Sequence, residues 1–171
     1  MRWLKKLLVV APAIWGLQTH IQAQSKAYGA MLGALLSHSV PEMRVETASR
    51  EASKLIFLDT REAREYAVSH IKGARWVGYD TFSLESIKDV PRDSRVVAYC
   101  SVGYRSEKIA EKLRAAGFKD VHNLYGGIFE WVNQGNAVYQ GDRPTDRVHA
   151  YDRVWGVWLK RGKKVYGNNE K

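Results

Sequence analysis

The sequence predicts an α/β fold in which helices cover both faces of a mostly parallel sheet. Two short apolar runs, residues 55–58 and 95–99, have the length and composition of strands that are buried on both sides. A polar stretch follows each run, and the second run also leads into apolar residues at helical spacing. Strands that alternate with helices are typical of parallel sheets, because parallel strands need a long crossover connection.

Length and composition favour one ordinary domain with tails. The 171 residues are 45% hydrophobic and 26% charged, which supplies enough apolar material for a core. The formal net charge is +9, but the basic residues are spread along the chain and no nucleic-acid-binding motif accompanies them. We therefore expect a solvated basic surface with some affinity for anions and no nucleic-acid partner.

The N-terminus has the features of an export signal over residues 1–23. Three basic residues precede an apolar stretch, residues 7–17, and small Ala23 is suited to the position before a cleavage point. The apolar stretch is too short to cross a bilayer core of about 30 Å. We expect an exported, periplasmic protein with no stable membrane insertion after cleavage; the alternative is an uncleaved amphipathic tail.

The rest of the chain divides into three parts. Residues 24–42 are expected to form an N-terminal helical extension, and residues 43–134 the α/β domain. Residues 135–171 are expected to form a loop and then an amphipathic helix that packs on the domain through its aromatic side. Within the domain, strands are predicted at 55–58, about 76–79, 95–99 and from about 120, and helices directly after Asp59, at 106–116 and within 126–135.

Capping patterns predict two helix boundaries. Asp59 and Glu62 have the spacing of a capping box, so Asp59 is expected to cap the helix that follows. Gly117 stands where a left-handed residue commonly ends a helix, and Phe118 can fold back on Leu113.

The chain contains one cysteine, Cys100, directly after the apolar run at 95–99. One cysteine excludes an internal disulfide and a cysteine-rich metal site, and no metal or other cofactor is expected. A lone thiol in an exported protein can oxidise or cross-link, which favours a chemical role over a packing role. Asp59 and Cys100 both follow predicted strands, where functional residues gather in parallel sheets.

The residues after Cys100 are expected to form a cradle for negative charge. Backbone N–H groups of residues 101–106 can turn inward, the helix expected from about Ser106 adds partial positive charge, and Arg105 adds a full charge. All three favour the thiolate, which makes Cys100 a nucleophile that needs no metal. Two reactions suit this geometry: phosphate transfer through a cysteinyl-phosphate and sulfur transfer through a persulfide. A single sulfur atom needs the tighter loop.

The region from about residue 43 to residue 134 resembles the rhodanese-like domain. The matching pieces, in order, are "LDTREAREY", "SHIKGA", "VVAYCSVGYRS", "LRAAGF" and "LYGGIFEWV". The resemblance implies a rhodanese fold, a catalytic cysteine and a persulfide intermediate. Sulfurtransferases of this family have an active loop of six residues and the related cell-cycle phosphatases one more; Arg105 lies five positions after Cys100, which is the shorter type.

The resemblance also implies the roles of the site residues. Cys100 would be the nucleophile, Arg105 would steady an anionic donor, and Asp59 and Arg61 would support the loop. The residues expected to bind the substrate are Ser101, Val102, Gly103, Tyr104, Arg105 and Ser106. The resemblance departs at Glu65, where two-domain thiosulfate enzymes carry a basic residue, and this leaves open whether thiosulfate is the physiological donor.

These observations predict a sulfurtransferase. A sulfane sulfur would pass from thiosulfate or a persulfide to Cys100 and then to a small thiol, cyanide or a protein acceptor. Three alternatives stay open: a non-catalytic binding module of the same fold for a protein partner, a phosphatase that uses a cysteinyl-phosphate, and a redox thiol without a resolving partner.

Overall fold

The computed structural model describes residues 26–167, and the chain divides after Leu35 into two compact units. Residues 26–35 are helical. The export signal expected over residues 1–23 lies outside the described residues. None of the helices found between residues 26 and 167 has the length and the apolar content to span a bilayer.

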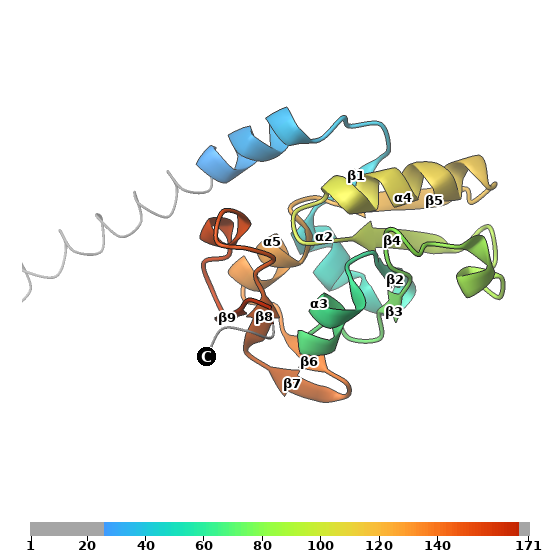
Figure 1. The fold of residues 1–171 in the computed structure, drawn as a ribbon. Coiled ribbons are helices and arrows are strands. Elements are labelled where there is room, and N and C mark those ends of the chain that lie inside the picture. The colour runs from blue at the N-terminus through green and yellow to red at the C-terminus, as the bar shows by residue number, and fades with distance from the viewer. Residues whose placement is uncertain (1–25, 168–171) are drawn as a thin grey trace, which may run out of the picture. The chain divides into compact units, whose positions relative to one another are not determined.

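The unit that begins at Leu36 is built on a sheet of five parallel strands (Figure 1). The order across the sheet is β1-β5-β4-β2-β3. The strands are β1 (Glu42–Met43), β2 (Ile56–Asp59), β3 (Arg75–Trp76), β4 (Arg95–Tyr99) and β5 (Asp120–Leu124). The predicted α/β class with a mostly parallel sheet is therefore confirmed.

Helices lie on both sides of this sheet. They are α2 (Val45–Arg50), α3 (Ala63–Val68), α4 (Tyr104–Ala115) and α5 (Gly127–Asn133), with short 3₁₀-helices η1 (Ala52–Lys54) and η2 (Leu84–Ile87). Figure 1 shows α4 on one side of the strands and α3 and α5 on the other.

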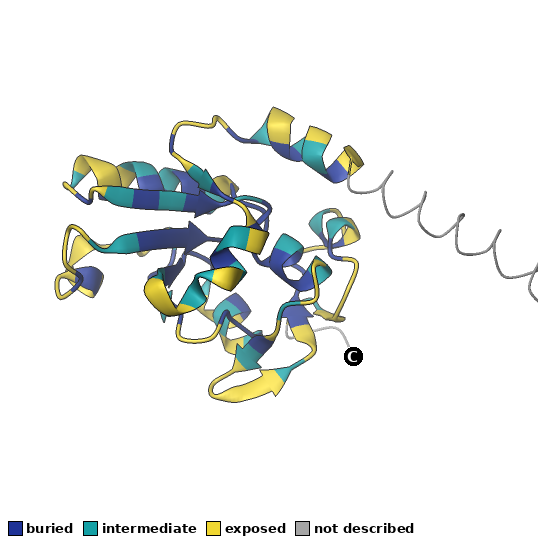
Figure 2. Cartoon of the chain, turned by 180° about the vertical axis from the view of Figure 1, so that it is seen from behind, coloured by how far each residue is buried: buried dark blue, intermediate teal, exposed yellow. Residues whose placement is uncertain are grey.

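Side-chain alternation along the strands explains the two layers. Leu58 and Ala98 point to one face and pack in a cluster with Ile109 of α4. Phe57, the neighbour of Leu58, points to the other face, where its ring meets Trp131 of α5 edge-on at 5.7 Å between centroids. The central strands β2 and β4 are accordingly buried after their first residue (Figure 2).

The C-terminal end of α4 follows its predicted boundary. Gly117 has φ +91°, which a glycine adopts without a steric penalty. The Phe118 N–H then donates to the Leu113 carbonyl at 3.1 Å, and both side chains belong to the core. The reversal of the chain after α4 is thus fixed as the glycine pattern predicts.

The predicted start of α3 is wrong by three residues. Glu62, not Asp59, is the N-cap, and it forms a capping box with Glu65. Asp59 belongs to β2 and its carboxylate binds Arg61 instead. The spacing of Asp59 and Glu62 matches the capping pattern, but the Asp59 carboxylate accepts its hydrogen bonds from the backbone N–H and the guanidinium of Arg61.

The expected C-terminal amphipathic helix is also wrong. The segment contains β6 (Val138–Gln140), β7 (Arg143–Thr145), β8 (Arg147–His149), the 3₁₀-helix η3 (Trp155–Trp158) and β9 (Lys163–Val165). β6 and β7 form an antiparallel hairpin, and β8 pairs with β9 in parallel. The chain between β8 and β9 is a short crossover that contains η3. In this crossover Leu159 is buried, whereas Val154 and Val157 are exposed.

Candidate active site around Cys100

Neighbouring strands bring Asp59 and Cys100 to the same edge of the sheet. Asp59 of β2 lies opposite Tyr99 of β4, the residue before Cys100. Thr60 continues this pairing, because its N–H donates to the Tyr99 carbonyl at 2.9 Å. The site therefore lies at the carboxyl ends of parallel strands, as expected.

The sulfur of Cys100 faces the loop that follows it. Cys100 is buried, and its Sγ accepts a hydrogen bond from the Gly103 N–H at 3.1 Å. Gly103 has φ +121°, a conformation that L side chains rarely adopt. It is also the N-cap of α4, which begins at Tyr104 and not near Ser106 as the sequence pattern indicated. The positive end of a twelve-residue helix thus lies close to the sulfur.

The first turn of α5 binds two backbone carbonyl groups of the Cys100 loop. The Ile128 N–H donates to the Cys100 carbonyl at 2.9 Å, and the Phe129 N–H donates to the Ser101 carbonyl at 3.1 Å. The first N–H groups of a helix have no partner within it, so here they fix the two carbonyls. Both carbonyl oxygens are therefore turned toward α5.

A buried amide and a buried hydroxyl fix the far end of the loop. Asn123 of β5 donates from Nδ2 to the Gly103 carbonyl at 3.0 Å. The Ser106 hydroxyl donates to Asn123 Oδ1 at 2.7 Å. Ser106, expected to bind the substrate, thus uses its hydroxyl within the protein, and Asn123 was not predicted from the sequence.

Arg105 is paired with a buried carboxylate. Its guanidinium donates to both oxygens of Glu65, at 2.7 Å from Nη1 and 2.9 Å from Nη2. Ser101 joins this pair, because its hydroxyl donates to Glu65 Oε1 at 3.2 Å. Glu65 is fully buried, and the Arg105 side chain is 14% exposed.

Burial and charge act in opposite directions on this pair. Burial alone would raise the pKa of Glu65, but the hydrogen bonds and the charge of Arg105 outweigh it and lower that pKa below 4.5. Burial disfavours the charge of Arg105, but the hydrogen bonds that Arg105 donates to Glu65, together with the negative charge of Glu65, raise the pKa of Arg105. Both groups are therefore charged near neutral pH.

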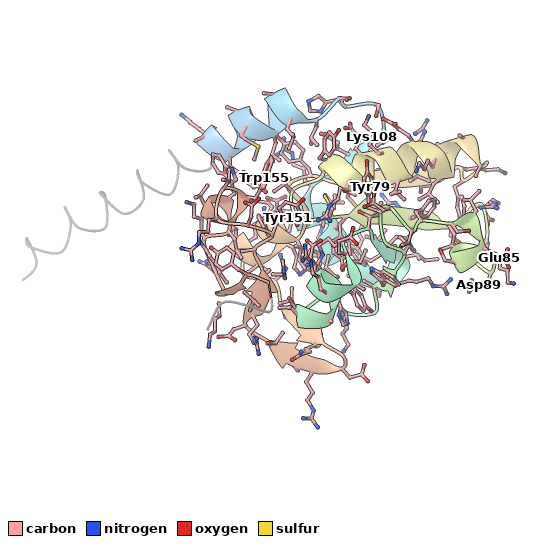
Figure 3. The ribbon with its side chains drawn as sticks, in the orientation of Figure 1. Tyr79, Glu85, Asp89, Lys108, Tyr151 and Trp155 are labelled. Atoms are coloured by element: carbon pink, nitrogen blue, oxygen red, sulfur yellow. The ribbon has the colours of Figure 1, made fainter. Side chains whose placement is uncertain are left out.

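The C-terminal segment also reaches Arg105. The Tyr151 ring lies beside the guanidinium, with the Arg105 Cζ 5.1 Å from the ring centroid. Tyr151 has φ +66°, and its N–H donates to His149 Nδ1 at 3.1 Å. Strand β8, which carries His149, packs against α3, which carries Glu65. Figure 3 labels Tyr151 near the centre of the view and Trp155 above it and to the left.

His149 is a second side chain that the C-terminal segment supplies near the site. It is buried, and because Nδ1 accepts from Tyr151, the neutral ring carries its proton on Nε2. Within the described part of the chain, Nε2 has no hydrogen-bond partner. Burial lowers the pKa of His149, so the ring is neutral near pH 7.

Asp59 and Arg61 form a fully buried ion pair beside the loop. The Arg61 Nη2 lies 2.6 Å from Asp59 Oδ2, and both side chains are inaccessible to solvent. Arg61 Nη2 also donates to the Ser69 carbonyl, and the Trp76 indole N–H donates to the Arg61 carbonyl. The pair thus ties the end of β2 to the chain that follows α3.

The structure brings the predicted residues of the Cys100 loop together, but they differ in how far they are exposed to solvent. Val102 is buried, whereas Tyr104 is 44% exposed. Glu65, Asn123 and Tyr151 complete the site; the family resemblance had aligned Glu65 with a basic residue of thiosulfate enzymes, whereas no sequence pattern pointed to Asn123 or Tyr151. Across residues 26–167, no three His, Cys, Asp or Glu side chains are grouped so that they could hold a metal ion.

Comparison with known proteins identifies the family of the central region. The family described as rhodanese-like domain matches residues 45–134, which is more than half of the chain. The tRNA uridine(34) hydroxylase of Pectobacterium carotovorum is 37% identical over 87 residues, and the match covers 48% of this chain and 24% of that protein. The probable adenylyltransferase/sulfurtransferase MoeZ of Mycobacterium tuberculosis is 35% identical over 82 residues, with 47% and 21% covered. The chain thus spans about a quarter of these relatives.

Solved structures agree with this assignment at the level of the fold. A rhodanese-related protein from Thermoplasma volcanium superimposes with a TM-score of 0.55 at 23% identity, covering 59% of this chain and 99% of that one. A thiosulfate sulfurtransferase from Pseudomonas aeruginosa gives a TM-score of 0.56 at 23% identity, covering 80% of this chain and 26% of that one. The family match and the fold lead to one conclusion: the chain belongs to the rhodanese-like domain family.

Proposed function

We propose that the protein is a sulfurtransferase in which Cys100 carries the transferred sulfur as a persulfide. The observation that carries this proposal is the hydrogen bond from the Gly103 N–H to Cys100 Sγ at the start of α4. An amide hydrogen and a helix N-terminus that converge on one sulfur stabilise negative charge there. Such a sulfur is a nucleophile.

The reaction would consist of two displacements. In the first, the Cys100 thiolate attacks the terminal sulfur of a donor, a new S–S bond forms, and the donor remnant leaves with the electron pair of the broken bond. In the second, an acceptor thiolate or cyanide attacks the terminal sulfur of the Cys100 persulfide and restores the thiolate. The Gly103 N–H, which faces Sγ, is suited to negative charge in both states.

The names of two of these relatives support sulfur transfer, and the name of the third describes a different reaction. Sulfur transfer is named for the Mycobacterium tuberculosis and Pseudomonas aeruginosa proteins, and tRNA hydroxylation for the Pectobacterium protein. This chain covers only about a quarter of each of them. The shared region therefore supports the sulfur-handling step for this chain, and we propose no further activity from these names.

Intact mass spectrometry tests the proposal directly. After exposure to a persulfide or thiosulfate donor, the protein should gain the mass of one sulfur atom and lose it again on addition of cyanide. Because Cys100 is the chain's one cysteine, Cys100→Ala should remove both the adduct and turnover. Turnover that survives in Cys100→Ala would overturn the proposal, and efficient hydrolysis of an aryl phosphate would favour a phosphatase instead.

A further inference from the structure

The charge of Arg105 is already compensated before any substrate arrives. Both carboxylate oxygens of Glu65 accept its hydrogen bonds, and Glu65 is fully buried. A carboxylate at 2.7 Å cancels most of the field of a guanidinium, because two opposite charges so close together act on a more distant group as a dipole and not as a full charge. Arg105 therefore offers little net positive charge to a ligand near Cys100.

The Tyr151 ring covers Arg105 from another direction. The guanidinium carbon lies 5.1 Å from the ring centroid, within the range of a cation–π contact. The left-handed backbone at Tyr151 is costly for an aromatic residue, and such strain persists where the surrounding structure imposes it. The His149 ring holds this conformation by accepting the Tyr151 N–H.

We propose that Glu65 and Tyr151 determine donor specificity by withdrawing Arg105 from anion binding. This inference rests on the proposed sulfur transfer. A doubly charged donor such as thiosulfate needs an uncompensated cation, since its leaving group is the sulfite dianion. The site instead selects organic hydropersulfides, whose leaving group is a singly charged thiolate.

Sulfur transfer from a hydropersulfide to Cys100 needs no oxidant, reductant or other reactant. The Cys100 thiolate attacks the terminal sulfur of R–S–SH, and the bond between the two donor sulfurs breaks. The products are Cys100–S–SH and R–S⁻, which leaves with the electron pair, so one negative charge enters and one leaves. Tyr104, the first residue of α4, is 44% exposed and offers aromatic surface to the organic group.

The test compares how fast two donors load Cys100. Rate constants for the gain of one sulfur are measured by intact mass with thiosulfate and with cysteine hydropersulfide, and their ratio is the readout. We expect the wild type to favour the hydropersulfide. Glu65→Gln keeps the shape of the side chain but removes its negative charge, so the charge of Arg105 is no longer compensated. The ratio of the two loading rate constants should then move toward thiosulfate by about tenfold.

A charge-matched control separates a local effect from a change in net charge. Glu85 pairs with Lys88 on the surface and lies far from Tyr151 (Figure 3). Glu85→Gln removes the same single negative charge, and the ratio should not change. A ratio in Glu65→Gln that equals those of the wild type and Glu85→Gln would overturn the inference while leaving sulfur transfer intact.

A second variant decides the matter if Glu65→Gln does not fold. Tyr151→Leu keeps the Glu65–Arg105 pair and uncovers one face of the guanidinium, so the ratio should move about threefold in the same direction. No movement would overturn the inference. If neither donor loads wild-type Cys100, the proposed function itself fails, and this result differs from an unchanged ratio.

Discussion

Gly127 lies against the backbone of Cys100 so closely that no side chain fits between them. A Cβ at Gly127 would stand 2.5 Å from the Cys100 carbonyl oxygen and 2.6 Å from that of Ser101. The same contact lets the Ile128 N–H reach the Cys100 carbonyl. Gly127→Ala should therefore push the loop and α5 apart, lower the free energy of unfolding by about 3 kcal/mol, and slow the loading of Cys100.

Gly141 offers a matched control for this substitution. Its φ of +57° nearly equals the +58° of Gly127, but a Cβ there would meet no atom within 4 Å. Gly141→Ala should cost only the backbone strain, about 1 kcal/mol, and leave loading unchanged. Urea unfolding of the two variants separates strain from collision, and equal losses would show that the contact with Cys100 is unimportant.

Asn123 should control the position of the Gly103 amide. Asn123→Asp keeps the size of the side chain but replaces the donor at 3.0 Å from the Gly103 carbonyl with an acceptor. Repulsion should move Gly103, whose N–H faces Cys100 Sγ, and slow loading by about tenfold or more. Stopped-flow or quenched mass measurements of loading provide the test.

The matched control is Asn136→Asp. Asn136 Nδ2 donates to the Trp131 carbonyl at 3.1 Å, which is the same kind of contact outside the Cys100 loop. This variant should lose a comparable hydrogen bond, about 1 kcal/mol, and load normally. Normal loading in Asn123→Asp would show that the loop keeps its shape without the amide.

The sequence predicted the central strands well because burial on both faces leaves a simple pattern, whereas the edge strand β1 was missed. The run at 95–99 became β4 without a change of bounds, and Cys100 follows it as expected. The C-terminal segment was mispredicted because Trp155 and Trp158 have helical spacing, whereas β8–β9 pairing decides the structure. Pairing between distant strands overrides local periodicity.

The partners of the loop could not be predicted in the same way. Cys100 and Gly103 are close in the sequence, so their contact follows from a local pattern. Glu65 and Arg105 are 40 residues apart, and Tyr151 lies outside the matched family region. Nothing in the spacing of such residues shows that tertiary packing brings them together, and the charge compensation of Arg105 is visible only in three dimensions.

Two ion pairs of the same chemistry should differ strongly in their effect on stability. Asp59 binds Arg61 where both are inaccessible to solvent, so Asp59→Asn would leave a buried charge without its partner. The free energy of unfolding should fall by about 3–5 kcal/mol. Asp89 binds Arg75 at the surface, with side chains 64% and 40% exposed, so Asp89→Asn should change stability little. Similar urea midpoints for both variants would contradict this account.

The stability that Glu65 contributes should depend on pH in a defined direction. Its pKa in the folded protein is below 4.5, because the hydrogen bonds and charge of Arg105 outweigh burial, while the unfolded chain keeps the ordinary value of 4.5. Between these two values the unfolded state binds more protons, so stability rises with pH through this window. The contribution is complete above pH 4.5 and is lost as the pH falls through the folded pKa.

Urea unfolding of the wild type and of Glu65→Gln between about pH 7 and about pH 3 measures this contribution. The wild type should be more stable by about 2 kcal/mol or more near neutral pH, because the variant leaves the Arg105 charge without its partner. The difference should shrink below pH 4.5, where protonation of Glu65 weakens the pair in the wild type as well. A difference that stays constant down to about pH 3 would mean that the Glu65 carboxylate does not hold Arg105 through its charge.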